Sequence, residues 1–130
     1  MPGANEKRKL LLVDDDEIHL AITGNMLKSE YETITVKSGK EALTHLLKGV
    51  VPDLILLDII MPNMDGWETY NRIRGISLLR DVPIAFLTSL DGKSEAQQAL
   101  EMGAADFIPK TCEKEEFLTR IDGIITKYGK

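Results

Sequence analysis

The sequence predicts an α/β domain built on a doubly wound, five-stranded parallel sheet with five helices. Short apolar runs alternate with helical patterns along its 130 residues, and at least three of the five runs are apolar at consecutive positions. A strand that is apolar on every residue is covered on both faces, as strands are in a parallel sheet between helix layers. Five βα units in about this length make a doubly wound domain.

The expected strands are the five apolar runs. They are Leu10–Val13, Ile34–Val36, Leu54–Leu57, Ile84–Leu87 and Phe107–Ile108. We expect the flavodoxin-like strand order 2-1-3-4-5, in which strands 1, 3, 4 and 5 are consecutive neighbours spaced ~4.8 Å apart.

The expected helices follow these runs. The last is the clearest, because apolar residues recur at helical spacing: Phe117, Leu118, Ile121, Ile124, Ile125 and Tyr128. The first two have shorter apolar faces, formed by Ile18, Ala21, Ile22 and Met26 and by Ala42, Leu43, Leu46 and Leu47. The third and fourth, near Trp67–Arg74 and Lys93–Met102, are less regular.

Length and composition favour one domain over residues 1–130, with residues 1–8 as a flexible N-terminal segment. The net charge of −5 disfavours nucleic acid as a direct partner, because phosphate binding requires a basic face. The single cysteine excludes an internal disulfide and fits a reducing compartment. No apolar run approaches the ~18 residues that a membrane helix needs, so we expect a cytoplasmic protein without membrane insertion.

Polar residues follow four of the five strands at the point where each strand ends. Asp14 and Asp15 follow the first, Asp58 the third, Thr88 the fourth and Lys110 the fifth. The carboxyl ends of the strands form the ligand crevice of such a sheet, so these side chains should meet there. Three clustered carboxylates require a divalent cation, and hard oxygen ligands suit Mg²⁺ or Mn²⁺.

The whole chain resembles a receiver domain of the bacterial response-regulator family. The matching motifs are VDDD at 13–16, LLDIIMPNMDG at 56–66, FLTS at 86–89 and FIPK at 107–110. One acidic pair would be a weak signal, whereas four motifs in the right order, each at a strand end, are a specific one.

The resemblance implies that Asp58 is the phosphoacceptor and that Asp14 and Asp15 hold Mg²⁺ with it, Mn²⁺ substituting. It also implies that the backbone carbonyl of Ile60 is a further metal ligand. The phosphoryl group would come from a histidine kinase or a phosphotransfer protein, and a small donor such as acetyl phosphate would supply it slowly. Such a domain is a signalling switch, not an enzyme in the usual sense, because it catalyses only its own phosphorylation and dephosphorylation.

The same resemblance assigns Thr88 and Lys110 to the phosphoryl group and Phe107 to the aromatic position whose rotamer reports activation. Phosphorylation would then control a downstream protein or an output domain. The family usually places proline after its lysine, but here Thr111 follows Lys110 and Pro109 precedes it. Because a cis bond without proline costs ~3–4 kcal/mol, we expect the Lys110–Thr111 bond to be trans.

Two apolar residues occupy positions that flank the attacking water in the family. Ile60 lies two residues past Asp58, and Leu90 lies two past Thr88. Neither can hydrogen-bond a water, so we expect them to shield the phosphoryl group and to make self-dephosphorylation slow. The alternative is that they only pack against each other at the rim.

Other polar residues have simpler interpretations. We expect Asp16 and Glu17 to cap the first helix, where acids are favoured by the positive end of the helix dipole. Gly66 after Asp65 indicates a turn that needs a permissive backbone. We interpret His19 and His45 as ordinary surface or helix positions and not as metal ligands. We interpret Cys112 as a thiol without a functional role.

Two other function classes fit parts of the sequence. A phosphatase of the haloacid-dehalogenase type needs two aspartates two residues apart after the first strand, as Asp14 and Asp16 are, but the chain looks too short for a cap. A flavodoxin-like cofactor binder needs a phosphate-binding loop at that point, where four successive acids would repel the phosphate.

Overall fold

The predicted class is confirmed by the computed structural model, which describes residues 7–88, 93–110 and 112–128. The five strands pair in parallel in the order β2-β1-β3-β4-β5. Their bounds are Arg8–Val13 (β1), Tyr31–Val36 (β2), Leu54–Leu57 (β3), Ile84–Thr88 (β4) and Asp106–Pro109 (β5). Each observed strand therefore contains or equals one of the predicted apolar runs.

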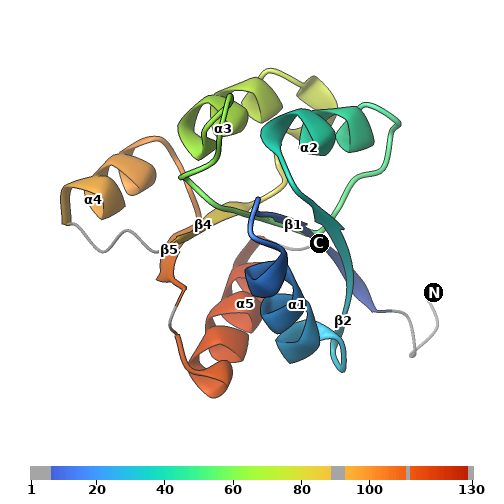
Figure 1. The fold of residues 1–130 in the computed structure, drawn as a ribbon, viewed down its shortest axis with the longest axis vertical. Helices are drawn as coiled ribbons and strands as arrows, with labels where there is room; N and C mark the ends of the chain where they lie inside the picture. Colours follow the sequence, from blue (N-terminus) through green and yellow to red (C-terminus); the bar gives the residue numbers. More distant parts are fainter. Residues whose placement is uncertain (1–6, 89–92, 111, 129–130) are drawn as a thin grey trace.

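Helices cover both faces of the sheet (Figure 1). They are α1 (Glu17–Leu27), α2 (Gly39–Leu46), α3 (Gly66–Arg74), α4 (Lys93–Glu101) and α5 (Lys114–Tyr128), with a short 3₁₀ helix, η1, at Ser77–Leu79. α1 and α5 lie on one face, and α2, α3 and α4 lie on the other. No helix in the described part of the chain is both long and apolar enough to cross a membrane.

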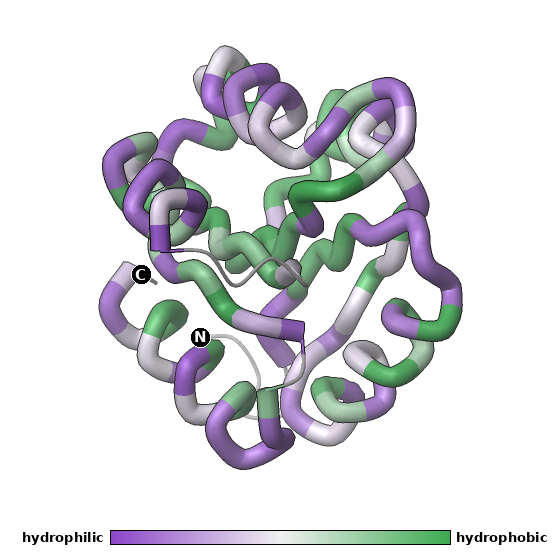
Figure 2. The backbone as a smooth tube through the Cα atoms, turned by 60° about the vertical axis from the view of Figure 1, so that its left-hand side comes forward, coloured by the Kyte–Doolittle hydropathy of each residue, from purple (hydrophilic) through white to green (hydrophobic). Residues whose placement is uncertain are grey.

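The sheet separates two hydrophobic cores, and β1 shows how its residues are divided between them. Leu10 and Leu12 pack with α1 and α5, whereas Leu11 and Val13 pack with the helices of the opposite face. All four are 1–2% exposed. The apolar segments accordingly run through the middle of the molecule, with hydrophilic segments around them (Figure 2). Strand-long apolarity thus reports burial on both faces, as predicted.

The predicted face of the first helix is wrong. Leu20 and Leu27 are buried, whereas Ile18 is 71% and Ile22 is 52% exposed. α1 has apolar residues on nearly every side, so its sequence does not single out one face. Packing against β1 and α5 decides which face is buried.

Candidate functional site

Strand pairing brings the predicted polar residues to one edge of the sheet. The backbone N–H of Asp58 donates to the carbonyl of Val13 at 2.9 Å, which places Asp58 beside the end of β1. On the other side, the N–H of Lys110 donates to the carbonyl of Thr88 at 2.9 Å. β1 and β3 end opposite each other at Val13 and Leu57, and β4 and β5 end opposite each other at Thr88 and Pro109, two residues further along. The loops after all four strands therefore start at the same edge of the sheet.

Lys110 supplies the positive charge that the acidic segment lacks locally. Its Nζ lies 3.0 Å from Oδ2 of Asp14 and 3.1 Å from Oδ2 of Asp58. All three side chains are buried, with 8%, 8% and 4% of their surfaces exposed for Lys110, Asp14 and Asp58. Lys110 was predicted to contact a phosphoryl group. Its bridge between two carboxylates was not predicted, since the three residues follow three different strands.

Burial and charge act in opposite directions on this cluster. Burial raises the pKa of Asp58, and the Asp14 carboxylate adds to the increase, although the ammonium of Lys110 opposes both. Burial lowers the pKa of Lys110, but its hydrogen bonds and charge interactions with Asp14 and Asp58 outweigh burial, so the pKa is raised. Lys110 therefore stays protonated at neutral pH, while the ionised form of Asp58 is only partly compensated.

The carboxylates meet the requirements of a hard cation. Asp14, Asp15 and Asp58 each offer an oxygen, and these oxygens all lie within 4.8 Å of one another. Asp15 is exposed and the other two are buried. Oδ1 of Asp58 is buried and has no hydrogen-bond partner in the described part of the chain. A buried carboxylate oxygen that no described residue hydrogen-bonds, beside two further acids, fits a divalent cation well.

Local structure holds the acids in place. Oδ1 of Asp14 accepts a hydrogen bond from the N–H of Asp16 at 2.9 Å. Asp16 is the N-cap of α1, as predicted, because its carboxylate accepts from the N–H of Ile18 at 2.9 Å. Glu17 was expected to cap the helix as well, but it lies in the first turn of α1. Its carboxylate pairs with Lys37 in the loop after β2, a contact that was not predicted. The four successive acids thus divide into distinct environments.

The other predicted residues lie around this cluster or outside the described chain. Thr88 is the last residue of β4 and is fully buried. Phe107 is half-buried against the core that contains Phe86, its partner across the β4–β5 ladder. Ile60 is 56% exposed. Leu90 and Thr111, which carry the shielding and trans-peptide predictions, lie outside the described residues.

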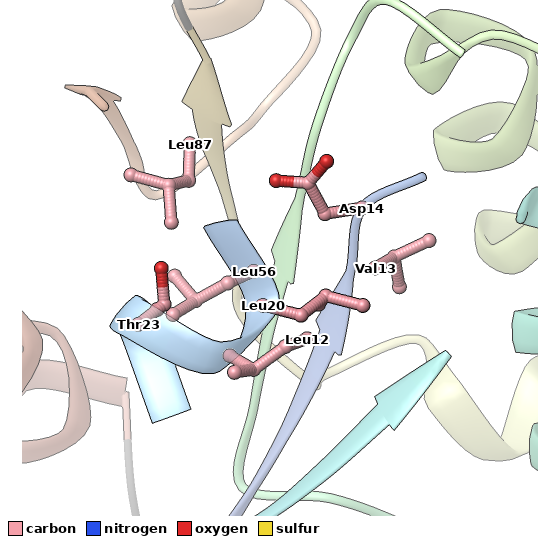
Figure 3. Close-up of a pocket in the computed structure, with 7 residues that line it drawn as sticks. All are labelled: Leu12, Val13, Asp14, Leu20, Thr23, Leu56 and Leu87. Atoms are coloured by element: carbon pink, nitrogen blue, oxygen red, sulfur yellow. The ribbon is translucent and has the colours of Figure 1, made fainter. Parts of the chain in front are cut away.

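A small cavity borders Asp14 on the side of α1 (Figure 3). Its volume is about 10 Å³, and its lining is formed by Leu12, Val13, Asp14, Leu20, Thr23, Leu56 and Leu87. That is about the space of a single water, far below the ~300 Å³ of a typical small ligand pocket. This cavity therefore does not serve as a ligand pocket next to the acids.

Gly66 was predicted to be a turn residue that needs a permissive backbone, and this prediction is wrong. Gly66 is the first residue of α3, with Asp65 as the N-cap, and its φ is not positive, unlike those of Gly49 and Gly103. The backbone of Asp58 and Ile59 lies where a side chain of Gly66 would be. Glycine is needed here for close approach, which the sequence alone does not distinguish from a turn.

The family model for the response regulator receiver domain matches residues 10–122. The chain belongs to this family. It is 34% identical over 114 residues to the response regulator PleD of Caulobacter vibrioides, a match that covers 87% of this chain and 25% of PleD. It is 35% identical to the transcriptional regulatory protein PhoP of Bacillus subtilis, with 92% of this chain and 49% of PhoP covered. The chain thus spans between a quarter and a half of these curated relatives.

A solved structure shows the same fold. The signal receiver domain of a histidine kinase from Syntrophus aciditrophicus is 30% identical, with a TM-score of 0.82 and coverage of 95% of this chain and 93% of that one. Receiver domains are signalling modules of two-component systems, so the predicted family, fold and general role are confirmed.

Proposed function

We propose that this receiver domain accepts a phosphoryl group on Asp58 from a histidine kinase or a phosphotransfer protein, in a reaction that needs Mg²⁺. The observation that carries the proposal is the buried Oδ1 of Asp58, which lacks a hydrogen-bond partner among the described residues although acids and a lysine surround it. This oxygen is available to react as a nucleophile, because no donor in the described chain hydrogen-bonds to it.

Asp14, Asp15 and Asp58 would hold the cation, together with the backbone carbonyl of Ile60. Mg²⁺, or Mn²⁺ in its place, would reduce the repulsion between these acids and an incoming phosphoryl group. Asp15 is the exposed member of the three, so it lies on the side from which a hydrated ion can approach. The side chains of Asp58, Lys110 and Thr88 would carry out the phosphoryl transfer itself.

In the proposed reaction a carboxylate oxygen of Asp58 attacks phosphorus while the bond from phosphorus to the histidine nitrogen of the donor breaks. The product is an acyl phosphate on Asp58. Lys110 already lies 3.1 Å from Asp58, where its ammonium would stabilise negative charge on the phosphoryl oxygens. The hydroxyl of Thr88 would donate a hydrogen bond to one of them.

The phosphoryl group would change the conformation by favouring one of two states of the domain. We propose that Thr88 moves toward it and that Phe107 moves inward behind Thr88. α4, β5 and α5 would form the surface that a downstream protein or an output domain recognises. The half-buried position of Phe107 and its pairing with Phe86 support this proposal, since an inward move would bring Phe107 into the existing core.

The proposal places the domain in the cytoplasm, without direct contact to nucleic acid, and gives it no turnover beyond its own phosphorylation and dephosphorylation. Residues 1–130 would act as a single domain. No observation in the described chain favours the phosphatase or the flavin-binding alternative over the receiver family.

The test is phosphorylation by acetyl phosphate and Mg²⁺, followed by intact mass. We expect one phosphoryl group on the parent protein and none on Asp58→Asn or in EDTA. Asp81→Asn is the matched control, because Asp81 is exposed and lies before β4, at the opposite edge of the sheet. A phosphoryl group on Asp58→Asn would overturn the assignment. Asp15→Asn should weaken metal binding, since the site loses a charged ligand.

A further inference from the structure

We propose that Gly66 is a positioning residue of the site: it lets the first turn of α3 pack directly on the backbone of Asp58 and Ile59 and so fixes the segment that carries the phosphoacceptor. This inference rests on the proposed function. It assigns a task to a residue that contacts neither the metal nor the phosphoryl group.

The contact is between backbones. A Cβ on Gly66 would lie 2.6 Å from Cα of Ile59 and closer still to the carbonyl oxygen of Asp58. The N–H of Gly66 donates to the carbonyl of Ile59 at 2.8 Å. The carbonyls of two successive residues, Asp58 and Ile59, are thus held against the start of one helix.

The rest of α3 is anchored independently, so it can act as a fixed support. The carboxylate of Asp65 caps the helix by accepting from the N–H of Glu68 at 2.9 Å. Tyr70 and Ile73 are buried in the core, and the hydroxyl of Tyr70 donates to the carbonyl of Met102 at 2.9 Å. The backbone of Asp58 and Ile59, which packs on the start of α3, is therefore held in a fixed position relative to the core.

The position of this segment controls two of the proposed ligands. Asp58 supplies the carboxylate, and Ile60, two residues on, supplies the backbone carbonyl. Ile59, which lies between them, is the residue whose carbonyl accepts from Gly66. Metal–ligand distances in proteins tolerate only about ±0.2 Å. A side chain on Gly66 needs more than that, since its Cβ must move away from backbone atoms that cannot rotate aside.

Among the glycines of the described residues, Gly66 is the one whose Cβ would lie closer than 3.0 Å to backbone atoms, whereas a Cβ on Gly39 would meet side-chain atoms of Thr69 and Met64. Gly49 and Gly103 have positive φ angles of 92° and 98°, so backbone conformation explains them. A Cβ on Gly123 in α5 would meet nothing within 4 Å. Gly123→Ala therefore changes the same residue type, inside a helix, without a steric conflict, and it serves as the matched control.

The first experiment measures Mn²⁺ binding by electron paramagnetic resonance on the full chain. We expect Gly66→Ala to weaken binding at least about tenfold, with Gly123→Ala equal to the parent. Ile73→Val, in the same helix, controls for lost stability alone and should also bind like the parent. A folded Gly66→Ala that binds Mn²⁺ as tightly as the parent would overturn the proposal, as would an equal loss in Ile73→Val.

The second experiment uses the parent protein, so it decides the matter even where Gly66→Ala does not fold. If the contact fixes the ligand segment, metal binding must stabilise the contact in return, because coupling between two sites is reciprocal. Hydrogen exchange of the Gly66 amide should slow at least about threefold on addition of Mg²⁺. The Gly75 amide, which bonds within the end of α3, should be unaffected. An unchanged Gly66 amide would contradict the proposal.

The two proposals fail in different ways. A parent protein that binds no Mn²⁺ and accepts no phosphoryl group would overturn the proposed function and this inference with it. A parent that binds and is phosphorylated, beside a Gly66→Ala variant or a Gly66 amide that shows no effect, would overturn this inference alone.

Discussion

The two ends of the sheet both hold a lysine or arginine paired with an aspartate, yet the pairs are physically unlike. At the carboxyl end, Lys110 and Asp58 are 8% and 4% exposed in their side chains. At the amino end, Arg8 and Asp53 are 45% and 37% exposed, with 3.6 Å between Nη1 and Oδ1. One pair is buried and tightly hydrogen-bonded, and the other is solvated and loose.

The two ion pairs differ in how strongly their charges affect the stability of the domain. Water screens the Arg8–Asp53 pair, so the pair contributes little to stability. The Asp53 carboxylate also accepts a shorter hydrogen bond, at 2.7 Å, from the backbone N–H of Lys9. The Lys110 pair has lost its hydration, and its charges depend on one another. A bound cation, or phosphorylation of the acid, would lower the free-energy cost of the buried negative charge. The exposed pair carries no such cost, because water already screens its charges.

The largest effect should come from removing the buried cation. Lys110→Met should lower the free energy of unfolding by about 3 kcal/mol at neutral pH without metal, because it leaves Asp14 and Asp58 buried and unpaired. Urea unfolding in EDTA measures this. The deficit should shrink as the pH is lowered, since protonation of the carboxyls removes the uncompensated charge. Lys48→Met is the control, because Lys48 is exposed. A deficit that does not change with pH would contradict a charge-based cause.

A smaller effect should appear in the lifetime of the acyl phosphate. Ile60→Asn with Leu90→Glu should release phosphate about tenfold faster, which corresponds to about 1.4 kcal/mol of the barrier, because polar groups can orient the attacking water. Ile60 is 56% exposed, so the fold should tolerate asparagine there. Ile60→Leu keeps the apolar shield and should keep the parent rate. If the double variant is no faster, the metal and Lys110 must set the lifetime instead.

A still smaller effect of opposite sign should follow from neutralising the phosphoacceptor. The folded-state pKa of Asp58 is raised, so the stability contributed by its protonated form is lost as the pH rises through that pKa. Asp58→Asn should therefore raise the free energy of unfolding at neutral pH without metal, by less than Lys110→Met lowers it. The gain should diminish toward pH 4. A variant less stable than the parent at neutral pH would show that Lys110 fully compensates the charge.

The smallest effect should come from the exposed pair. Arg8→Ala should change the free energy of unfolding by less than about 0.5 kcal/mol, because solvent and salt screen both charges. The measurement is urea unfolding of parent and variant at low and high salt. A loss as large as that of Lys110→Met would abolish the distinction between the two ends.

Several features followed from the sequence without any coordinates. Consecutive apolar residues predicted buried parallel strands, since every position of such a strand faces a helix layer. The rule that ligand sites lie at the carboxyl ends of strands then predicted that Asp14, Asp58 and Lys110 would meet. The structure brings these three together, and their roles in phosphoryl transfer stay predictions.

Tertiary structure decided what depends on distances between segments remote in the chain. α1 is apolar on nearly every side, so only packing selected Leu20 and Leu27 over Ile18 and Ile22. The bridge from Lys110 to Asp14 depends on how far the Lys110 side chain reaches across the ends of β4 and β3, which lie between β5 and β1. Sequence by itself thus determined which residue types lie at the site, because strand periodicity and topology are local or follow general rules. Only the folded chain determined which atoms touch and which oxygen of Asp58 has no hydrogen-bond partner among the described residues, because burial and hydrogen bonding are set jointly by every segment that packs there.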